Sequence, residues 1–439
     1  MNSPLRKAPA PPRSPDQSRK ALAASAIGNF VEWYDFAVYG YSAPVIAKLF
    51  FPSSDQTTAL LATLAILGTT FLFRPLGGIY FGRLGDRAGR RNALAAVVLL
   101  MGVSTVLIGL LPTYASIGAS APILLVLLRL LQGFSSGGEY SGASTFLSEH
   151  APQHRRGMWA GMSAATTTLP FTAAALVVLS LSTASHQAYA AWTWRIPFLI
   201  AGPLALVGLY IRLRLEDSPV YRQLEQTGAV EQSSIGQVLR HYRREVFLVF
   251  GIASLNGVGF YTVSSYVPTY LTSTVGLGQT VALTANCIAL CVYSVLAPLL
   301  GRLGDVHGRR PVLLAGATGL TTLAVPAYLL IGQGSWATAV LGQLLLIGPL
   351  VAVASVVAIA QAELFPTQIR YTGSAIGYNA AYAIFGGTAP FAGAFLVAQL
   401  HSPIAPAFYL LAMGTLSLPV VTRFPETSRL PLNRPYNRR

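Results

Sequence analysis

The sequence predicts an all-α integral membrane protein with twelve transmembrane helices in two six-helix pseudo-repeats. Three observations lead to this fold class. Only 10% of the 439 residues are charged and 53% are hydrophobic, whereas about 25% of residues are charged in ordinary soluble domains. Apolar runs of about 20 residues, the length that crosses a bilayer core, recur along the chain. A ten-residue basic segment also occurs twice.

The apolar runs define the expected spans. Each run is continuous and nearly free of charged residues, unlike the alternating pattern of β-barrel strands. Several runs exceed 25 residues, so we expect tilted helices or helix ends in the interfacial region. The twelve runs cover residues 21–50, 57–82, 91–111, 119–146, 157–181, 194–213, 245–272, 279–303, 311–331, 336–361, 371–398 and 404–423.

Basic residues follow a one-sided pattern along the chain. Of the 30 Lys and Arg, 26 lie in the two tails and in alternate loops, at 83–91, 155–156, 212–244, 302–310 and 370. The intervening loops hold only Lys48 and Arg195. By the positive-inside rule, a multi-pass protein of the cell (plasma or inner) membrane with both termini in the cytoplasm is expected. The net charge of +15 then reflects topology, and nucleic-acid binding is not expected.

Two pairs of matching segments indicate an internal duplication. "GRLGDRAGRR" at 82–91 and "GRLGDVHGRR" at 301–310 agree at eight of ten positions. "EHAPQHRR" at 149–156 and "ELFPTQIR" at 363–370 share a Glu-x-x-Pro-x-x-x-Arg pattern. Each copy follows the second or the fourth span of its half, so the two halves have the same order of elements.

The duplication divides the chain into two six-helix bundles with three connecting or terminal segments. We expect a disordered cytoplasmic tail, a first bundle, a cytoplasmic linker, a second bundle and a second tail, at 1–20, 21–213, 214–244, 245–423 and 424–439. Six-helix halves with a site between them are typical of secondary transporters. Cys287 and Cys291 lie four residues apart in one span, so we interpret them as packing residues, and no metal site or cofactor is expected.

Five segments, taken together and in order, resemble the major facilitator superfamily and, within it, the metabolite:proton symporter branch. That branch includes carriers of α-ketoglutarate, citrate, shikimate, and proline or glycine betaine. The resemblance extends from about residue 21 to 427. The segments are "GNFVEWYDFAVYG", "FLFRPLGGIYFGRLGDRAGRR", "RLLQGFSSGGEYSGA", "WRIPF" and "ELFPTQIRYTG", which begin at residues 28, 71, 129, 194 and 363.

The first span has a polar face. Asn29, Glu32, Asp35 and Tyr39 recur at three- and four-residue steps, which stack side chains on one side of a helix. Such a face should border protein or water, because lipid offers no hydrogen-bond partners. Two nearby acids resist ionising together, so one of them could accept a proton near neutral pH. The alternative is that an acid only pairs with an arginine and holds helices together.

Two arginines lie inside spans and are the counterparts of these acids. Arg74 lies within the second apolar run, and Arg129 shares a helix face with Gln132 and Glu139. Either guanidinium could bind a substrate carboxylate or neutralise an acid. We favour Arg129 for binding the substrate, and Asn29, Tyr39, Gln132 and Arg74 are further candidates for substrate contacts, although a structural role is favoured for Arg74. The candidates for proton coupling are Glu32, Asp35 and Glu139.

The second half offers polar and aromatic groups in place of charges. The membrane interiors of its spans contain no evident acid or base, and the six histidines all lie near span ends or in loops. Titratable chemistry is therefore expected in the first half only. The second-half candidates for substrate contacts are Asn256, Tyr261, Tyr378 and Asn379, although aromatic residues in spans more often serve packing.

The resemblance implies a cytoplasmic gate that fastens the two halves and releases during transport. The residues that match its motifs are Asp86, Arg90, Glu149 and Arg156 in the first half and Asp305, Arg309, Glu363 and Arg370 in the second. The second copy of the loop replaces Arg87 by Val306, which should weaken its fastening. The alternative is that these arginines only set the membrane topology.

We therefore expect a proton-coupled symporter that imports a small organic solute by alternating access, and the resemblance implies a carboxylate or zwitterion such as proline, betaine or α-ketoglutarate. The alternative is a proton-driven exporter of drugs or metabolites, since one fold allows both. The chain is not expected to be an enzyme or an ATP-driven pump, because no lysine follows a glycine as in a phosphate-binding loop. Its partners should be protons, the solute and the lipid bilayer, and it should act as a monomer. Three acids against two arginines in the spans favour a zwitterion or monoanion over citrate.

Overall fold

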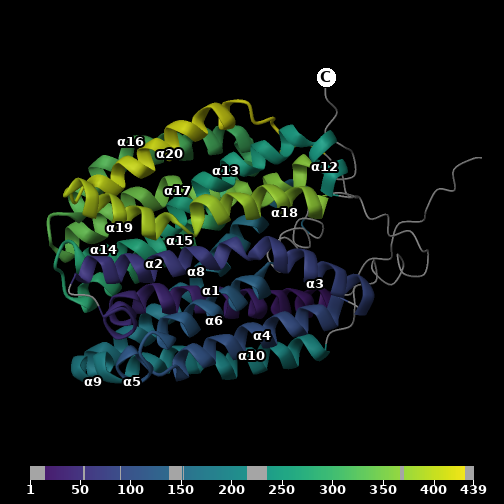
Figure 1. Cartoon of the computed structure of the whole chain (residues 1–439). Helices are drawn as coiled ribbons and strands as arrows, with labels where there is room; N and C mark the ends of the chain where they lie inside the picture. Colours follow the sequence, from purple (N-terminus) through teal and green to yellow (C-terminus); the bar gives the residue numbers. More distant parts are fainter. Residues whose placement is uncertain are drawn as a thin grey trace, which may run out of the picture.

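The computed structural model describes residues 15–52, 55–88, 90–137, 151, 153–214, 235–365 and 370–430. Within these ranges the chain consists of helices joined by short turns and contains no strands. The helices run side by side along one direction, with helices up to α10 in the lower part of the view and helices from α13 onward in the upper part (Figure 1). The two predicted halves are thus adjacent layers of one bundle.

The first half contains six spans. The helices are α1 (Pro15–Phe50), α2 (Gln56–Leu72), α3 (Arg74–Ala88), α4 (Arg90–Leu110), α6 (Ser120–Ser136), α8 (Arg156–Ala184) and α10 (Ile196–Arg214). The short helices α5 (Tyr114–Ile117) and α9 (His186–Ala191) lie together at one end of the bundle (Figure 1). Helices α2 and α3 form one span that is interrupted at Phe73, because Pro75 has no N–H to continue the hydrogen-bond ladder.

The second half has the same number of spans. Its elements are α12 (Ile235–His241), α13 (Arg243–Tyr261), the π-helical turn η3 (Thr262–Tyr266), α14 (Val267–Ser273), α15 (Gln279–His307), α16 (Arg309–Ile331), α17 (Trp336–Leu364), α18 (Arg370–Ala381), the π-helical turn η4 (Tyr382–Gly386), α19 (Ala389–Leu400) and α20 (Ala405–Thr422). One span joins α13, η3 and α14, and another joins α18, η4 and α19.

The prediction of twelve spans in two halves is confirmed. Among the described residues, nine helical runs are long and apolar enough to cross a membrane, and α4 and α6 provide two shorter apolar helices. The twelfth span is α1, whose polar face lowers its hydropathy. Helix α1 begins at Pro15, six residues before the predicted start at 21, and proline is well tolerated at the first helical position.

Large apolar side chains lie on the outside of the bundle, and some charged side chains lie inside it. Leu99, Val103 and Leu107 on α4 are large exposed apolar residues, and their four-residue spacing makes a stripe on one face. Arg74 and Arg129 are almost completely buried. Lipid can solvate the apolar stripe but offers nothing to a charge. The charged groups must therefore find partners inside the bundle.

Glycines bring helices close together both within and between the halves. In the first half, a Cβ on Gly133 would overlap the Thr70 carbonyl, and one on Gly137 would overlap the Arg74 carbonyl. Between the halves, α8 packs along α15, and a Cβ on Gly161 would overlap the Ala297 carbonyl. Small residues at such positions allow backbones to approach. The first contact holds α2 and α3 against α6, which positions both buried arginines beside α1.

The contact between α8 and α15 predicts a stability difference between two glycine substitutions. Gly161→Ala should lower stability by about 1–3 kcal/mol, the usual range for overpacking, because backbone must move to admit the methyl group. Gly68→Ala is the matched control, since its Cβ would meet the Gly387 carbonyl at an ordinary 3.4 Å across the same boundary between halves. The melting temperature in detergent measures both effects. Equal melting temperatures for the two variants would contradict the close packing.

Candidate functional site

The polar face of α1 is buried among helices and does not face lipid. Glu32 and Asp35 are both 0% exposed, and Asn29 and Tyr39 are also buried. Helix α1 contacts α2, α4, α6, α8 and α10 of its own half and α14 and η3 of the other half. The expectation that this face borders protein is met for all four residues.

Glu32 forms an ion pair with Arg74. Arg74 Nη2 lies 2.5 Å from Glu32 Oε1, and the guanidinium also lies over the rings of Phe36 and Phe71, 5.1 and 4.6 Å from their centroids. The interruption at Phe73 makes Arg74 the first residue of α3, with its side chain against the middle of α1. The rings favour the cation and shield the pair from solvent.

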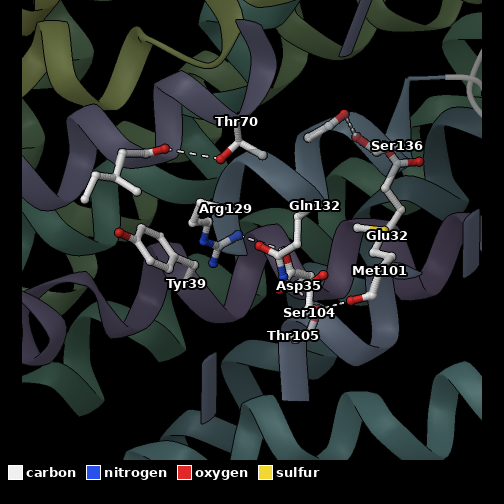
Figure 2. A network of polar contacts seen from close by, with 12 residues as sticks. Glu32, Asp35, Tyr39, Thr70, Met101, Ser104, Thr105, Arg129, Gln132 and Ser136 are labelled. Carbon is white, nitrogen blue, oxygen red and sulfur yellow. Dashed lines mark hydrogen bonds and ion pairs between the residues drawn. The ribbon is translucent and has the colours of Figure 1, made fainter. Parts of the chain in front are cut away.

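Asp35 forms a second ion pair with Arg129. Arg129 Nη1 lies 2.8 Å from Asp35 Oδ2, and Gln132 Nε2 donates to Asp35 Oδ1 at 2.8 Å. Gln132 Nε2 also lies 2.8 Å from Thr105 Oγ1. The guanidinium is 3.7 Å from the centroid of the Tyr39 ring. Figure 2 shows Arg129 and Gln132 converging on Asp35 from one helix, and every partner described for this pair belongs to the first half.

The sequence left open which arginine meets which acid, and the structure gives each carboxylate its own guanidinium. Each charge is thus compensated separately in a buried site. Removing one partner of such a pair costs about 3–5 kcal/mol, since the other charge is left uncompensated. Several donors remain available: Arg74 Nε and Arg129 Nε and Nη2 have no hydrogen-bond partner in the described part of the chain. These donors could bind an anionic group of a solute.

An aromatic cluster lies at the boundary between the halves, next to the Glu32–Arg74 pair. It consists of Trp33, Phe71 and Phe171 from the first half and Phe260 and Tyr261 from the second. Sequence reasoning identified only Tyr261 as a candidate. The other rings looked like ordinary packing residues, because the sequence does not indicate which rings of the two halves meet.

The second-half candidates surround one side of this cluster. Asn256 Nδ2 donates to Tyr382 Oη at 2.9 Å, and the Tyr378 ring stacks on Tyr382 with 4.2 Å between centroids. The Tyr261 and Tyr382 rings meet edge to face. Asn379 is half-buried on α18. Asn256, Tyr261 and Tyr378 therefore form one connected group at the boundary with the first half.

The basic end of the bundle, where residues 155–156 and 302–310 lie, is fastened across the two halves. Asp305 accepts hydrogen bonds from the backbone N–H groups of Gly157 and Met158 at 2.7 and 2.9 Å. Arg309 pairs with Asp305 at 2.9 Å and with Glu363 at 3.2 Å. These contacts join the start of α8 to α15, α16 and α17.

Residues after α20 add to this end and were missed by sequence reasoning. Thr427 Oγ1 donates to Glu363 Oε2 at 2.6 Å, and Arg156 Nη1 donates to the Leu430 carbonyl at 3.0 Å and lies 3.9 Å from Glu363. Glu426 accepts the first two backbone N–H groups of α16. Burial raises the pKa of Glu426, but hydrogen bonds from three backbone N–H groups more than offset this and hold that pKa below its usual range.

Some predicted site residues cannot be placed. Glu139 and Glu149 lie outside the described residues. Asp86, Arg90 and Arg370 belong to helices, but the structure does not describe their side chains. The first-half copy of the gate therefore stays a prediction, as does proton coupling by Glu139.

The end of the bundle opposite the basic end is also joined across the halves. Tyr41 Oη on α1 donates to Asn286 Oδ1 on α15 at 3.0 Å. Asn286 Nδ2 in turn lies 2.8 Å from the Val263 carbonyl and 3.0 Å from Gln343 Oε1. The buried ion pairs thus lie between two sets of contacts that join the halves.

The described residues offer no group of three or more His, Cys, Asp or Glu side chains arranged to hold a metal ion. The groups described at the site supply ion pairs, hydrogen bonds and ring faces. Such a set can bind charged solutes and exchange protons, and both activities depend on carboxylates that change partners.

Comparisons with known proteins agree with this architecture. The family model described as "Sugar (and other) transporter" matches residues 20–231 and again 221–435, which corresponds to the two halves. The glycine betaine/proline/ectoine/pipecolic acid transporter OusA of Dickeya dadantii is 37% identical over 94% of this chain and 84% of its own length. The proline/betaine transporter of Escherichia coli (strain K12) is 36% identical over 94% of this chain and 85% of its own length.

Solved structures give the same fold. The chain is similar to the major facilitator superfamily proton:xylose symporter XylE bound to 6-bromo-6-deoxy-D-glucose, with a TM-score of 0.75, 18% identity, and coverage of 95% of this chain and 98% of that chain. Its likeness to the inward open conformation of XylE from E. coli has a TM-score of 0.70, 19% identity, and coverage of 94% and 97%. The chain therefore belongs to the sugar (and other) transporter family and is a multi-pass membrane transporter with the fold of the major facilitator superfamily.

Proposed function

We propose that this protein is a proton-coupled symporter that imports a small zwitterionic solute of the proline or betaine type. The observation that carries the proposal is the presence of two separate buried ion pairs with different surroundings. The partners described for Asp35–Arg129 all belong to the first half, whereas Glu32–Arg74 borders rings that meet the second half. The Asp35–Arg129 pair suits a proton site, and the Glu32–Arg74 pair suits a solute site.

The Glu32–Arg74 pair suits a zwitterion on electrostatic grounds. A solute carboxylate would take the place of Glu32 on Arg74, and the solute ammonium would then neutralise Glu32. One ion pair becomes two, and no charge is left uncompensated in the low-dielectric site. A dianion would add an unbalanced negative charge, which is costly in a membrane interior. The names of the relatives, which include proline, betaine and ectoine, support the same solute class.

We assign the two arginines the opposite of the roles that the sequence favoured. Arg74 lies against Phe71, whose ring meets Tyr261 of the second half with 5.3 Å between centroids. Arg129 is occupied by Asp35 and covered by the Tyr39 ring. Arg74 is therefore the better candidate for binding the solute carboxylate. Arg129 is the better candidate for the counter-charge of the proton site, because protonation of Asp35 would release its guanidinium.

The conformational cycle follows from the contacts at the two ends. Opening the basic end requires Asp305 to release the backbone of α8, and opening the opposite end requires Tyr41 to release Asn286. During alternating access, the contacts at one end would break while the contacts at the other end stay formed. On the basis of the positive-inside rule, we propose that the protein lies in the cell membrane with its basic end and both termini facing the cytoplasm. We propose a monomer as the working unit, with residues 82–91, 149–156 and 363–370 as the rest of the gate.

Uptake by purified protein in liposomes tests the function. An inside-alkaline gradient should drive accumulation of radiolabelled glycine betaine or proline, and an uncoupler should abolish it. Uptake that ignores the gradient would overturn proton coupling, and uptake of dicarboxylates in preference to zwitterions would overturn the proposed solute class.

Asp35→Asn should separate coupling from binding. Asparagine keeps the shape of the side chain but cannot ionise, so solute should exchange across the membrane without accumulating against a gradient. Counterflow and gradient-driven uptake, measured side by side, check this expectation. Asp55→Asn is the matched control, because Asp55 is an exposed cap of α2 that hydrogen-bonds Thr57 and Thr58. Gradient-driven accumulation by Asp35→Asn at the wild-type level would refute the role of Asp35.

Arg74→Lys should weaken solute binding although it keeps the charge. Lysine lacks the planar fork that holds a carboxylate and stacks on rings, so KM should rise about tenfold or more, a loss of about 1.4 kcal/mol. The control is Arg195→Lys, since Arg195 bonds the Leu111 carbonyl outside the site. If instead Arg129→Lys raises KM and Arg74→Lys does not, the assignment of the two arginines is reversed.

Asp305→Asn should open the basic end. The substitution removes the charge that pairs with Arg309 and one of the two acceptors that hold the start of α8. Spin labels at the exposed His154 and Val306, in a background that lacks Cys287 and Cys291, should report a longer or broader distance by electron-electron resonance. Asp55→Asn again serves as the control. An unchanged distance distribution would remove Asp305 from the gate.

A further inference from the structure

We propose that the aromatic cluster at the boundary between the halves is a cage for the alkylated ammonium group of the solute, with Trp33 as its main recognition residue. The proposal rests on the proposed function, because it requires a solute that carries both a cation and a carboxylate. It identifies the residues that distinguish an N-methylated ammonium from a primary one. These residues are aromatic and do not belong to the two ion pairs.

The Trp33 ring is fixed in orientation within the first half. Its Nε1–H donates to Asn29 Oδ1 at 2.8 Å, one turn earlier on α1. Phe171 on α8 lies beside it, with 6.1 Å between ring centroids. Asn29 was predicted to contact solute, and in the proposed cage it holds the indole. A recognition ring held in this way loses little side-chain entropy when a ligand binds.

Two rings of the second half complete the cluster. Phe260 and Tyr261 are neighbours on α13, and their centroids lie 5.6 and 6.1 Å from that of Trp33. Phe260 also meets Phe171 edge to face at 5.3 Å. The cluster therefore combines residues from both sides of the boundary at which the halves must separate. A solute that enters from either end would meet these rings.

Charged and polar groups lie directly beside the rings. Glu32 precedes Trp33 in the chain, and Arg74 lies over Phe71, which in turn contacts Tyr261. The Tyr261 hydroxyl is completely buried and has no hydrogen-bond partner among residues 15–430 as far as they are described. It lies close enough to Arg74 and Glu32 to interact with both electrostatically. A buried tyrosine hydroxyl normally finds a partner, so this one is a vacant donor for the solute carboxylate.

This arrangement suits a binding site. An unsatisfied hydroxyl and unsatisfied guanidinium N–H groups lie beside rings contributed by both halves, so donors for an anion and ring faces for a cation occur together. A fully methylated ammonium has no N–H to donate, so hydrogen-bond acceptors cannot recognise it, whereas ring faces attract it electrostatically. The rings would thus select for the alkylated cation, while Arg74 and Tyr261 bind the carboxylate.

A neutral isostere tests the cage directly. In 3,3-dimethylbutanoate a carbon atom replaces the nitrogen of glycine betaine, so the shape and the carboxylate are kept and the positive charge is lost. Binding of both compounds to purified protein, measured by titration calorimetry, should favour betaine by about tenfold or more. Trp33→Leu should bring this ratio close to one, and Trp33→Phe should retain most of it.

Two controls keep the result interpretable. Trp192→Leu removes a tryptophan that is 55% exposed and should leave the ratio unchanged. The melting temperature of each Trp33 variant establishes that it is folded. A ratio near one in the wild type, or an unchanged ratio in folded Trp33→Leu, would overturn the cage. So would wild-type protein that does not bind betaine.

Failure of the cage and failure of the proposed function have different signatures. If wild-type liposomes accumulate proline or betaine in response to a proton gradient while Trp33→Leu keeps the betaine preference, the function stands and the cage is wrong. If the gradient drives no uptake of any zwitterion, the function itself is wrong, whatever the binding ratio.

Discussion

A charge buried in hydrocarbon needs a partner, and this requirement organises the whole molecule. Glu32 and Asp35 lie on one face of α1, completely buried, and each holds a different arginine. The pairs can form only if Arg74 at the start of α3 and Arg129 on α6 are held beside α1. Glycines at the α2–α3 and α6 contact allow that approach. The polar face that is costly in a membrane is therefore also what specifies the arrangement of the first half.

The same pairs suit transport because they are stable only while both partners are present. A proton on Asp35 would free Arg129 and Gln132, and a solute at Arg74 would free Glu32. Each event changes contacts of α1, which also reaches the second half through Tyr41 and Asn286. Helix α1 thus connects the charge state of the site to the closure of one end. Packing alone, which has no titratable component, would not provide such a link.

The sequence predicted the framework well. The spans, the duplication and the buried face of Asn29, Glu32, Asp35 and Tyr39 follow from local composition and period, which a single helix expresses by itself. The pairing of Glu32 with Arg74 and of Asp35 with Arg129 could not be derived, because helical period gives a face but not its neighbour. The aromatic cluster was missed for the same reason: Trp33 meets Phe260 only through the docking of two halves. Glu426 and Thr427 were missed because they reach their partners only when the chain returns after α20. Glu426 then accepts from the backbone at the start of α16, and Thr427 donates to Glu363 on α17.

The central claim is that the buried carboxylates of α1 move protons together with the solute. The most direct measurement is the internal pH of liposomes, followed with a trapped dye, while glycine betaine or proline flows inward down its own gradient with no imposed pH difference. The account predicts that the interior acidifies as solute enters and that this acidification stops when Asp35 is neutralised. Solute entry at constant internal pH would contradict it.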